Sequence, residues 1–471
     1  MSTSVPKRLT TAQIVFLVVA AAAPLVAMAG TVPLSIGVGN GVGVPGTYLL
    51  ATITLLFFSV GYAAMARIVT RGGGFYSYVA EGLGRPAAGA GAVFALVAYN
   101  ALVAALAGGL GYFITEGVGI KAPWWIFSLL GVLIMTLLGA RSIDLSAKVL
   151  SVLMIAEIAV LTVFNLSVLF SLGADAFTWS SFSPSEVFSG APGVAFMFAF
   201  GSFFGFEAAA LYAEESRDPA REVPRATYAA VIVIGVFYMF TSWMMIGALG
   251  AAKAKAEAAE HSGQLFLKLS ADQLGDVASA LFGLMIITSV FASLLSAHNA
   301  TSRYLLAMGR DGLLPGALGR THPKHGSPAN ASHVQAIAIA LVIVVFAILN
   351  LDPYRQLVAV MSGLSTLGII LLQTLASLAI IMYFRRRRDP RLIRTVVAPV
   401  LGSLGMLTAT YFLLANFDVL ADSKNPVMLA MPYIVIGGAV LCAIYVAVLR
   451  RTNPTVYARV GGMDLSEGND K

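Results

Sequence analysis

The sequence predicts an all-α membrane protein, because most residues are apolar, few are charged, and the apolar residues gather in long runs. Of the 471 residues, 58% are hydrophobic and 11% are charged. Soluble domains carry about 25% charged residues, so this chain has too few charges to cover a water-facing surface of its size. We therefore expect one integral membrane domain that spans residues 1–471.

Twelve apolar segments are long enough to cross a bilayer, whose hydrocarbon core takes a helix of about 20 residues. They lie at about 10–40, 44–67, 86–116, 122–141, 145–171, 190–214, 225–250, 274–308, 332–351, 354–384, 395–417 and 427–450. The first follows Lys7 and Arg8, as in a signal peptide, but it continues past Gly30 without a short apolar core and a cleavage site. We interpret it as a retained first helix.

The basic residues predict how these helices are oriented. An even number of spans places both termini on one side, and cytoplasmic segments carry an excess of Lys and Arg. With cytoplasmic termini, the inner segments hold 24 of the 30 basic residues. The outer segments hold only Lys121, Lys253, Lys255, Lys268, Arg355 and Lys424.

This distribution predicts a multi-pass protein of the cytoplasmic (inner) membrane, with cytoplasmic tails at 1–9 and 451–471. The net charge of +7 then reflects topology and not a nucleic-acid partner. A role in nucleic-acid or regulatory lipid binding for Arg385–Arg388 is the weaker alternative. Residues 251–276 are rich in Ala, Lys and Glu and predict one or two amphipathic helices on the outer surface. They form either a solvated connector or a lid over the substrate path.

The first and sixth helices carry helix-breaking residues within their apolar runs. These are Pro24, Gly30 and Pro33 in the first helix, and Gly201, Ser202 and Gly205 in the sixth. Pro removes a backbone donor and clashes with the preceding turn, and Gly admits unusual dihedral angles. Membrane proteins tolerate a broken helix only where it is buried in protein or lines a cavity. Transporters with inverted repeats place substrate at two such breaks, five helices apart.

The ends of broken helices suit a zwitterion. The N-terminus of a half-helix carries free N–H groups and a partial positive charge, which favours a carboxylate. Exposed carbonyl groups at the opposite half-helix end suit an ammonium group or a cation. A small-molecule α-amino acid matches both ends, and we expect it as the substrate.

Two carboxyl groups and four polar residues are further site candidates. Ionisable residues at membrane depth are costly and usually functional. Glu157 lies near the middle of the fifth helix and is expected to exchange a proton, or else to bond a neighbouring helix. Glu207 follows the sixth-helix break and either gates or ties that helix to the first. Cavity-lining candidates, which would serve equally as interhelical hydrogen bonders, are Tyr99, Asn100, Ser289 and Ser293.

Other chemistry finds little support in the sequence. The single cysteine, Cys442, excludes an intrachain disulfide and a Cys-ligated cluster. The five His residues form no HExxH pair, and no GxxxxGK[ST] loop for ATP is present. We therefore expect no enzyme, no metal site and no cofactor beyond a coupling ion, either a proton or sodium.

Three motifs resemble the amino acid–polyamine–organocation superfamily. They are FGFEAAALYAEESRDPAREVPRAT at Phe204–Thr227, GGGFYSYVAEGLGRP at Gly72–Pro86 and RYLLAMGRDGLLP at Arg303–Pro315. The resemblance implies a leucine-transporter-like fold with two inverted repeats of five helices, at about 10–171 and 190–384, and two appended helices within 395–450. It also implies discontinuous helices 1 and 6.

By the same resemblance, the substrate's amino and carboxylate groups lie at the two breaks. The implied binding residues are Val26, Ala27, Met28, Ala29, Gly30, Gly201, Ser202, Phe203, Phe204 and Gly205. Gly201 stands where some relatives carry an aromatic gate, which implies a roomier pocket. Glu157 stands where several relatives carry a lysine, which implies a reversed local charge.

The leading hypothesis is a secondary amino-acid transporter, working by proton-coupled symport or by exchange. A polyamine or other organic cation is the alternative substrate, because buried carboxylates would pair with amines. A channel or membrane sensor is a third hypothesis, which the short tails and the lack of a repeated filter sequence disfavour.

Overall fold

The computed structural model describes residues 10–68, 74–141, 147–206, 216–323 and 325–462. Within these ranges ten helices are long and apolar enough to cross a membrane, and two apolar helices are shorter. The ten spans are Thr11–Gly30, Val32–Ala66, Arg85–Gly117, Ser151–Ala176, Arg221–Leu249, Asp276–Asp311, Ala329–Ile348, Pro353–Arg386, Ile393–Ala415 and Pro426–Thr452. The shorter two are α7 (Trp124–Ala140) and α10 (Pro192–Gly201).

Each of the twelve predicted apolar segments overlaps one of the helices or short helical runs. In chain order the main helices are α1 (Thr11–Ala21) with α2 (Pro24–Gly30), α4 (Val44–Ala66), α6 (Arg85–Tyr112), α7, α8 (Ala147–Leu172), α10, α11 (Pro219–Leu249), α14 (Asp276–Asp311), α15 (Ala329–Ile348), α16 (Ala359–Arg386), α17 (Ala398–Ala415) and α19 (Pro426–Thr452). The prediction of an all-helical membrane protein is confirmed.

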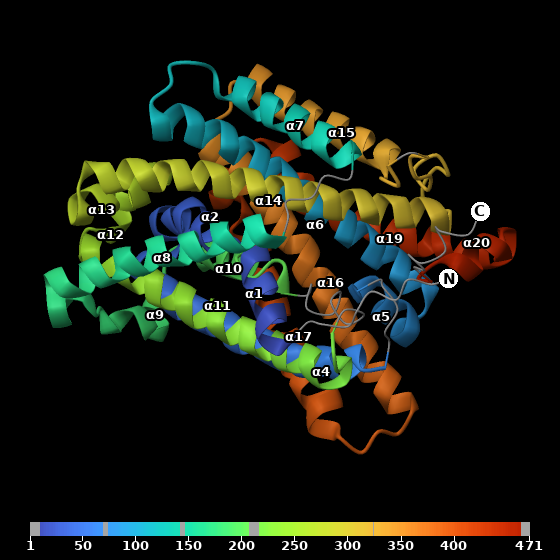
Figure 1. The fold of residues 1–471 in the computed structure, drawn as a ribbon. Helices are drawn as coiled ribbons and strands as arrows, with labels where there is room; N and C mark the ends of the chain where they lie inside the picture. The colour runs from blue at the N-terminus through green and yellow to red at the C-terminus, as the bar shows by residue number, and fades with distance from the viewer. Residues whose placement is uncertain (1–9, 69–73, 142–146, 207–215, 324, 463–471) are drawn as a thin grey trace.

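The long helices lie roughly along one direction, so the molecule has two ends (Figure 1). One end carries α12 (Ala254–His261) and α13 (Leu265–Leu274), two short helices within residues 251–276, where one or two helices were predicted. The opposite end carries two short helices that the sequence did not predict, α5 (Gly74–Leu83) and α20 (Pro454–Arg459). We call them the α12–α13 end and the α20 end.

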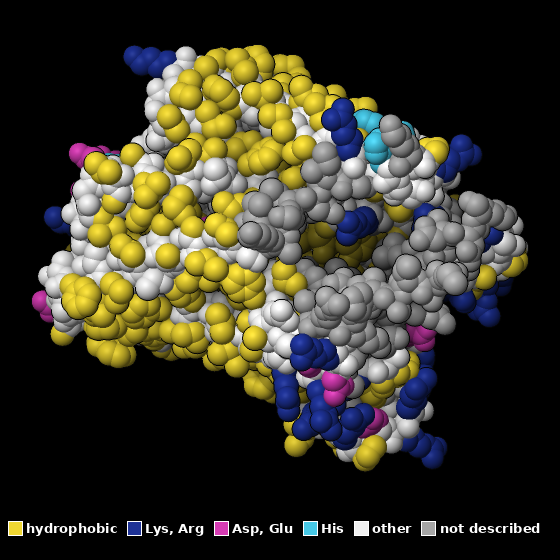
Figure 2. All heavy atoms as spheres, viewed as in Figure 1, with side chains coloured by type: hydrophobic (Ala, Val, Ile, Leu, Met, Phe, Trp, Pro, Cys, Tyr) yellow, Lys and Arg dark blue, Asp and Glu magenta, His cyan; other side chains and the backbone are white. Residues whose placement is uncertain are grey.

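The surface between the two ends is apolar, as a lipid-facing surface must be. Figure 2 shows hydrophobic side chains over most of the visible face, while many Lys and Arg side chains gather towards the α20 end. Large exposed apolar residues lie on the outer helices, for example Leu341 on α15 and Leu441 on α19. The interior between the helices holds the buried aromatic and polar side chains that form the site.

Candidate substrate and coupling site

The first membrane helix is interrupted before Pro24. Helix α1 ends at Ala21, Ala23 has left-handed dihedral angles (φ 44°, ψ 72°), and Pro24 begins α2. Proline cannot donate to the carbonyl four residues earlier, and it disfavours helical geometry in the residue before it. As the first residue of a new helix it fits well, because no donor is needed there.

Two side chains satisfy the backbone groups that this break leaves free. The Tyr238 hydroxyl, on α11, donates to the carbonyl oxygen of Ala22 at 3.2 Å. The N–H of Leu25, in the first turn of α2, donates to Glu157 Oε2 at 3.2 Å. A break at membrane depth needs such partners, since no water or further helical turn supplies them.

The predicted position of this break is therefore wrong by several residues. Val26–Gly30, interpreted as the break, lie within α2 and are helical. The physical reason is that Pro24 stops the incoming helix at once, whereas Gly30 is tolerated in the last turn of a short helix. A second irregularity follows at Thr31, whose φ of −122° and ψ of −31° separate α2 from α3 (Val32–Leu34).

The helix in the sixth apolar segment ends at the predicted helix-breaking residues. Helix α10 ends at Gly201, and the chain continues in tight turns in which Phe204 N–H bonds the Gly201 carbonyl at 3.0 Å. Gly205 has a φ of +103°, a backbone conformation that residues other than glycine rarely adopt. Ser202 holds the helix end, since its hydroxyl donates to the Phe198 carbonyl at 2.7 Å and lies 2.9 Å from the Tyr48 hydroxyl.

The two interruptions meet in space. A Cβ atom added at Gly205 would lie 3.2 Å from the Cβ of Ala21 and 3.5 Å from its carbonyl oxygen. The end of α1 and the end of the first half of helix 6 are thus in backbone contact. The two chain segments that carry the predicted helix-breaking residues therefore lie side by side.

Glu157 lies beside this junction and is 6% exposed. Besides its bond to Leu25, its carboxyl group faces the hydroxyl of Ser289 on α14. That hydroxyl is buried and has no hydrogen-bond partner among the described residues. The buried Tyr238 hydroxyl also lies within electrostatic range of Glu157. Glu157 therefore joins α8 to the break, with α11 and α14 on either side.

The remaining candidates lie in different surroundings. Tyr99 packs edge-on against Phe204 and at a tilt of 35° against Tyr304, with ring centroids 4.8 Å apart in both pairs. The Asn100 amide donates to the Leu96 carbonyl of its own helix at 2.8 Å, and Ser293 is half-buried. Glu207 lies outside the described residues.

The pocket at Gly201 is not roomy. A Cβ atom at this position would lie 2.5 Å from the hydroxyl oxygen of Thr366 on α16. The space that an aromatic gate would fill is therefore taken by a neighbouring helix. Phe203, by contrast, is 1% exposed and lies 6.3 Å from the Tyr238 ring, so it is part of the packed wall.

Sequence reasoning missed the tyrosines of the site. Tyr48 and Tyr238 are fully buried, with their rings edge-to-face at 6.1 Å. Their signal in the sequence is a lone phenol in the middle of an apolar run, as in GTYLLA and VFYMF. A buried Tyr hydroxyl usually has a partner, but only the fold shows that the partners are the two broken helices.

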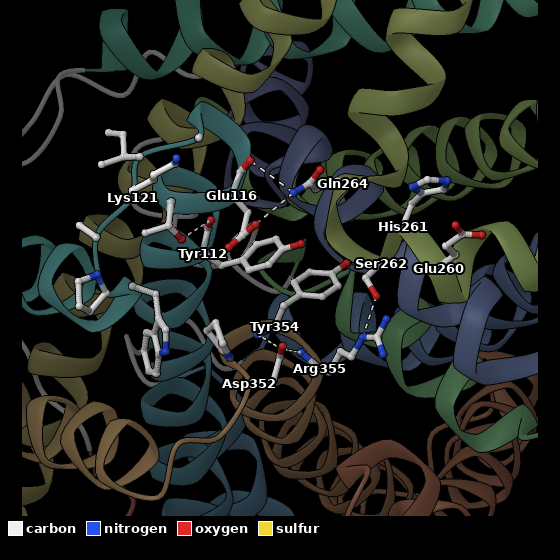
Figure 3. A pocket seen from close by; sticks show the side chains of 17 residues that line it. Tyr112, Glu116, Lys121, Glu260, His261, Ser262, Gln264, Asp352, Tyr354 and Arg355 are labelled. Atoms are coloured by element: carbon white, nitrogen blue, oxygen red, sulfur yellow. Dashed lines mark hydrogen bonds between the residues drawn. The ribbon is translucent and has the colours of Figure 1, made fainter.

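A cavity of about 830 Å³ opens at the α12–α13 end (Figure 3). Its floor contains Tyr112 and Tyr354, whose rings stack at 4.8 Å, and the Tyr354 hydroxyl donates to the Gly30 carbonyl at 2.9 Å. Tyr354 thus links the wall of this cavity to the last residue of α2, the helix that begins at the break. A narrower cavity of about 170 Å³ lies between Pro33, Phe198 and Ala258.

Within the described residues, no three His, Cys, Asp or Glu side chains gather as a metal site. The polar atoms at the break are instead one carboxylate, hydroxyl groups and free backbone groups. Two broken membrane helices that meet beside a buried carboxylate define a class of proteins, the transporters that bind a small molecule at helix breaks.

Comparison with known proteins identifies the family within this class. The amino acid permease family matches residues 9–441, so the chain belongs to that family. It is 26% identical over 397 residues to the branched-chain amino acid permease BcaP of Bacillus subtilis, covering 79% of this chain and 81% of that protein. It is 25% identical over 386 residues to the low-affinity putrescine importer PlaP of Escherichia coli, covering 77% and 79%.

The fold resembles that of a solved transporter. The crystal structure of the Eremococcus coleocola manganese transporter, in complex with an aromatic bis-isothiourea substituted compound, aligns with a TM-score of 0.60. The alignment covers 97% of this chain and 99% of that one at 13% identity. This likeness concerns the fold alone.

Proposed function

We propose that this protein is a secondary active transporter that carries amino acids across the cytoplasmic membrane by alternating access. It works by proton-coupled symport or by exchange. Membership in the amino acid permease family and similarity to a branched-chain amino acid permease support an amino acid as substrate. The site supports the coupling.

The observation that carries the proposal is the hydrogen bond from Leu25 N–H to Glu157 Oε2. The first turn of α2 carries the positive end of the helix dipole, and its Leu25 N–H has its acceptor outside the helix, so the turn favours an anion. In this structure Glu157 occupies that place. A substrate carboxylate would seek the same place, so Glu157 and the substrate compete for it.

Protonation resolves this competition. A neutral carboxyl group accepts a weaker hydrogen bond than a carboxylate does, so a protonated Glu157 leaves the start of α2 to the substrate. When the substrate departs, Glu157 loses its proton and returns to the Leu25 N–H. A proton and an amino acid therefore bind together and leave together, which is the requirement for symport.

The substrate would lie along α2 and the turns after α10. We assign its carboxylate to the first turn of α2, next to Val26 and Ala27, and its ammonium group to carbonyl groups freed by the two breaks. The rest of the proposed binding site is formed by Met28, Ala29, Gly30 and the Gly201–Gly205 turns. Phe203 and Phe204 contact its side chain, and Glu207 retains its proposed gating role.

The proposed architecture has twelve spans in two inverted repeats of five and a final pair. Short helices support it: α5 follows the second span at the α20 end, and α12 and α13 follow the seventh span at the α12–α13 end. Corresponding connections at opposite ends are what inverted repeats produce. The placement of basic residues puts the α20 end and both termini in the cytoplasm.

The test is uptake of a radiolabelled amino-acid panel into proteoliposomes, with and without an inward proton gradient. We expect the gradient to raise uptake at least tenfold in the unmodified protein. The Glu157→Gln variant mimics the protonated state, so it should transport or exchange without responding to the gradient. Glu81→Gln, which makes the same change at an exposed carboxyl group of α5, is the matched control. A Glu157→Gln protein that responds to the gradient like the unmodified one contradicts the coupling role.

Two alternatives have their own tests. Similarity to a putrescine importer favours an organic cation as the second candidate substrate, and putrescine would then displace the labelled substrate while neutral amino acids would not. Sodium is the second candidate for the coupling ion, because hard cations take oxygen ligands and Glu157, Ser289 and the Ala22 carbonyl supply them. In that case a sodium gradient, and not a proton gradient, would drive uptake.

A further inference from the structure

One arginine stands in the wall of both cavities at the α12–α13 end. Arg355 lines both the wide cavity and the narrow one, as does Ser262. The narrow cavity runs between the outer parts of the first and sixth membrane helices, at Pro33, Leu34 and Phe198. Arg355 therefore lies where the wide cavity and the narrow one adjoin.

Arg355 ties the α12–α13 pair to the start of the span Pro353–Arg386. Its Nε donates to Ser262 Oγ at 2.9 Å (Figure 3). Its Nη2 donates to the Ala259 carbonyl at 2.7 Å. Ser262 begins the short turn η7 (Ser262–Gln264) between α12 and α13. The backbone of Arg355 is fixed in turn, because its N–H donates to Asp352 Oδ1 at 2.6 Å.

The partners of this guanidinium are neutral, although it lies among charges of both signs. The carboxylates Glu116, Glu260 and Asp352 and the ammonium of Lys121 line the same cavity. The other guanidinium N–H groups of Arg355 bond to none of the described residues. Hydrogen bonds from a guanidinium to a carboxylate are roughly twice as strong as those between neutral groups, and they are often bidentate. A free carboxylate in the cavity would therefore displace Ser262 and Ala259.

We propose that Arg355 is an outer binding site for the carboxylate of an incoming amino acid, and that capture of this carboxylate releases the α12–α13 pair. The inference rests on the proposed function and deepens it, because a diamine has no carboxylate and would not release the pair. Ala258 and Ala259 of α12 line the narrow cavity. Their release opens the way past Pro33 and Phe198 towards the break.

The neighbouring residue couples this latch to the first helix. Tyr354, the residue before Arg355, is 1% exposed, and its hydroxyl donates to the Gly30 carbonyl. Arg355 in turn donates to Ser262 Oγ and to the Ala259 carbonyl. Asp352 Oδ1 accepts from the N–H groups of both Tyr354 and Arg355. A movement at Arg355 is therefore transmitted to the end of α2 through two adjacent residues of one turn.

The first experiment measures uptake from the outside by Arg355→Gln. The probe is L-leucine, or whichever amino acid of the panel the unmodified protein takes up best. We expect the KM for uptake to rise about tenfold while the maximal rate changes less than threefold. Arg355→Lys should keep part of the affinity, and Lys121→Gln, in the same cavity, should behave like the unmodified protein. An unchanged KM in Arg355→Gln overturns the proposal.

The second experiment follows the release directly. Cys442→Ser removes the native thiol, and Ala258→Cys places a buried thiol on α12 beside the narrow cavity. We expect the outside amino acid to accelerate labelling by a membrane-impermeant thiol reagent several-fold, and its α-amide and putrescine to have no such effect. With Arg355→Gln added, labelling should be fast without substrate. A labelling rate that the amino acid does not change overturns the proposed release of the α12–α13 pair.

Failure of the two proposals can be told apart. If the unmodified protein shows no saturable uptake of any amino acid, the proposed function fails. If the unmodified protein transports and Arg355→Gln transports with the same KM, only the outer site fails.

Discussion

At the scale of single residues, the site depends on polar groups that replace lost helical hydrogen bonds. Tyr238 and Glu157 bond the carbonyl and the N–H that the break before Pro24 leaves free. Both side chains are needed as hydrogen-bond partners, because a buried backbone group without a partner costs free energy. The same atoms are the ones that a substrate's charged ends would use.

Tyr238→Phe should therefore lower the free energy of unfolding, because the break loses a hydrogen bond. It removes the donor to the Ala22 carbonyl and leaves that buried oxygen without a partner, at a cost of about 1–3 kcal/mol. We expect a lower midpoint of thermal unfolding in detergent and slower uptake. Tyr411→Phe removes a hydroxyl from a side chain that is 68% exposed and serves as control. Equal midpoints for both variants would show that the Ala22 carbonyl does not need this donor.

The sequence could predict Glu157 but not its partners. A carboxyl group in the middle of an apolar helix is conspicuous in one dimension. Nothing in the sequence distinguishes Tyr48, Tyr238 and Thr366 from other residues of their apolar segments. They become site residues only because three other helices bring them to the breaks. The tight contact between Gly201 and Thr366 likewise depends on how α10 and α16 pack.

At the scale of elements, the broken first helix depends on one proline. Proline in a helix interior costs about 3 kcal/mol or more, and here that cost separates α1 from α2. The sequence predicts a break in this helix because three breakers lie in one apolar run. It does not show which of them acts, since Gly30 and Pro33 are accommodated at the ends of short helices.

Pro24→Ala should make the first helix more continuous. Alanine restores an N–H that can bond the Ala20 carbonyl, so α1 and α2 can join and the Leu25 N–H is no longer free for Glu157. We expect uptake to fall at least tenfold while the unfolding midpoint stays equal or rises. Pro33→Ala, which changes a proline beyond the break, is the comparison. Full transport by Pro24→Ala would mean that the break is not needed.

At the scale of the whole molecule, a contact at the α20 end joins three distant parts of the chain. The Tyr76 hydroxyl on α5 donates to Asp311 Oδ2 at 3.0 Å and accepts from the Gly461 N–H at 2.9 Å. A Cβ atom at Gly461 would collide with Ala80 of α5. Arg85 at the start of α6 also bonds the Ala458 carbonyl at 3.1 Å. None of this follows from hydropathy, which predicts only a cytoplasmic tail.

Tyr76→Phe should loosen this tail. The lost bond to the Asp311 carboxylate is worth about 1.5–3 kcal/mol, which corresponds to a tenfold or larger rise in the undocked population. We expect faster trypsin cleavage after Arg459, measured by mass spectrometry on protein in detergent. Tyr433→Phe, at a side chain that is 60% exposed on α19, should leave the rate unchanged. Equal rates for the two variants would contradict the docking role.

The docked tail also has a consequence for biosynthesis. Tyr76 and Gly461 are 385 positions apart, so the phenol emerges from the ribosome long before its partner exists. Contacts of such separation form late, because the intervening chain must be ordered first. The junction of α5, α14 and the tail can close only after the last span has entered the membrane. Assembly of the α20 end is therefore a step that follows translation, and truncated chains would stall before it.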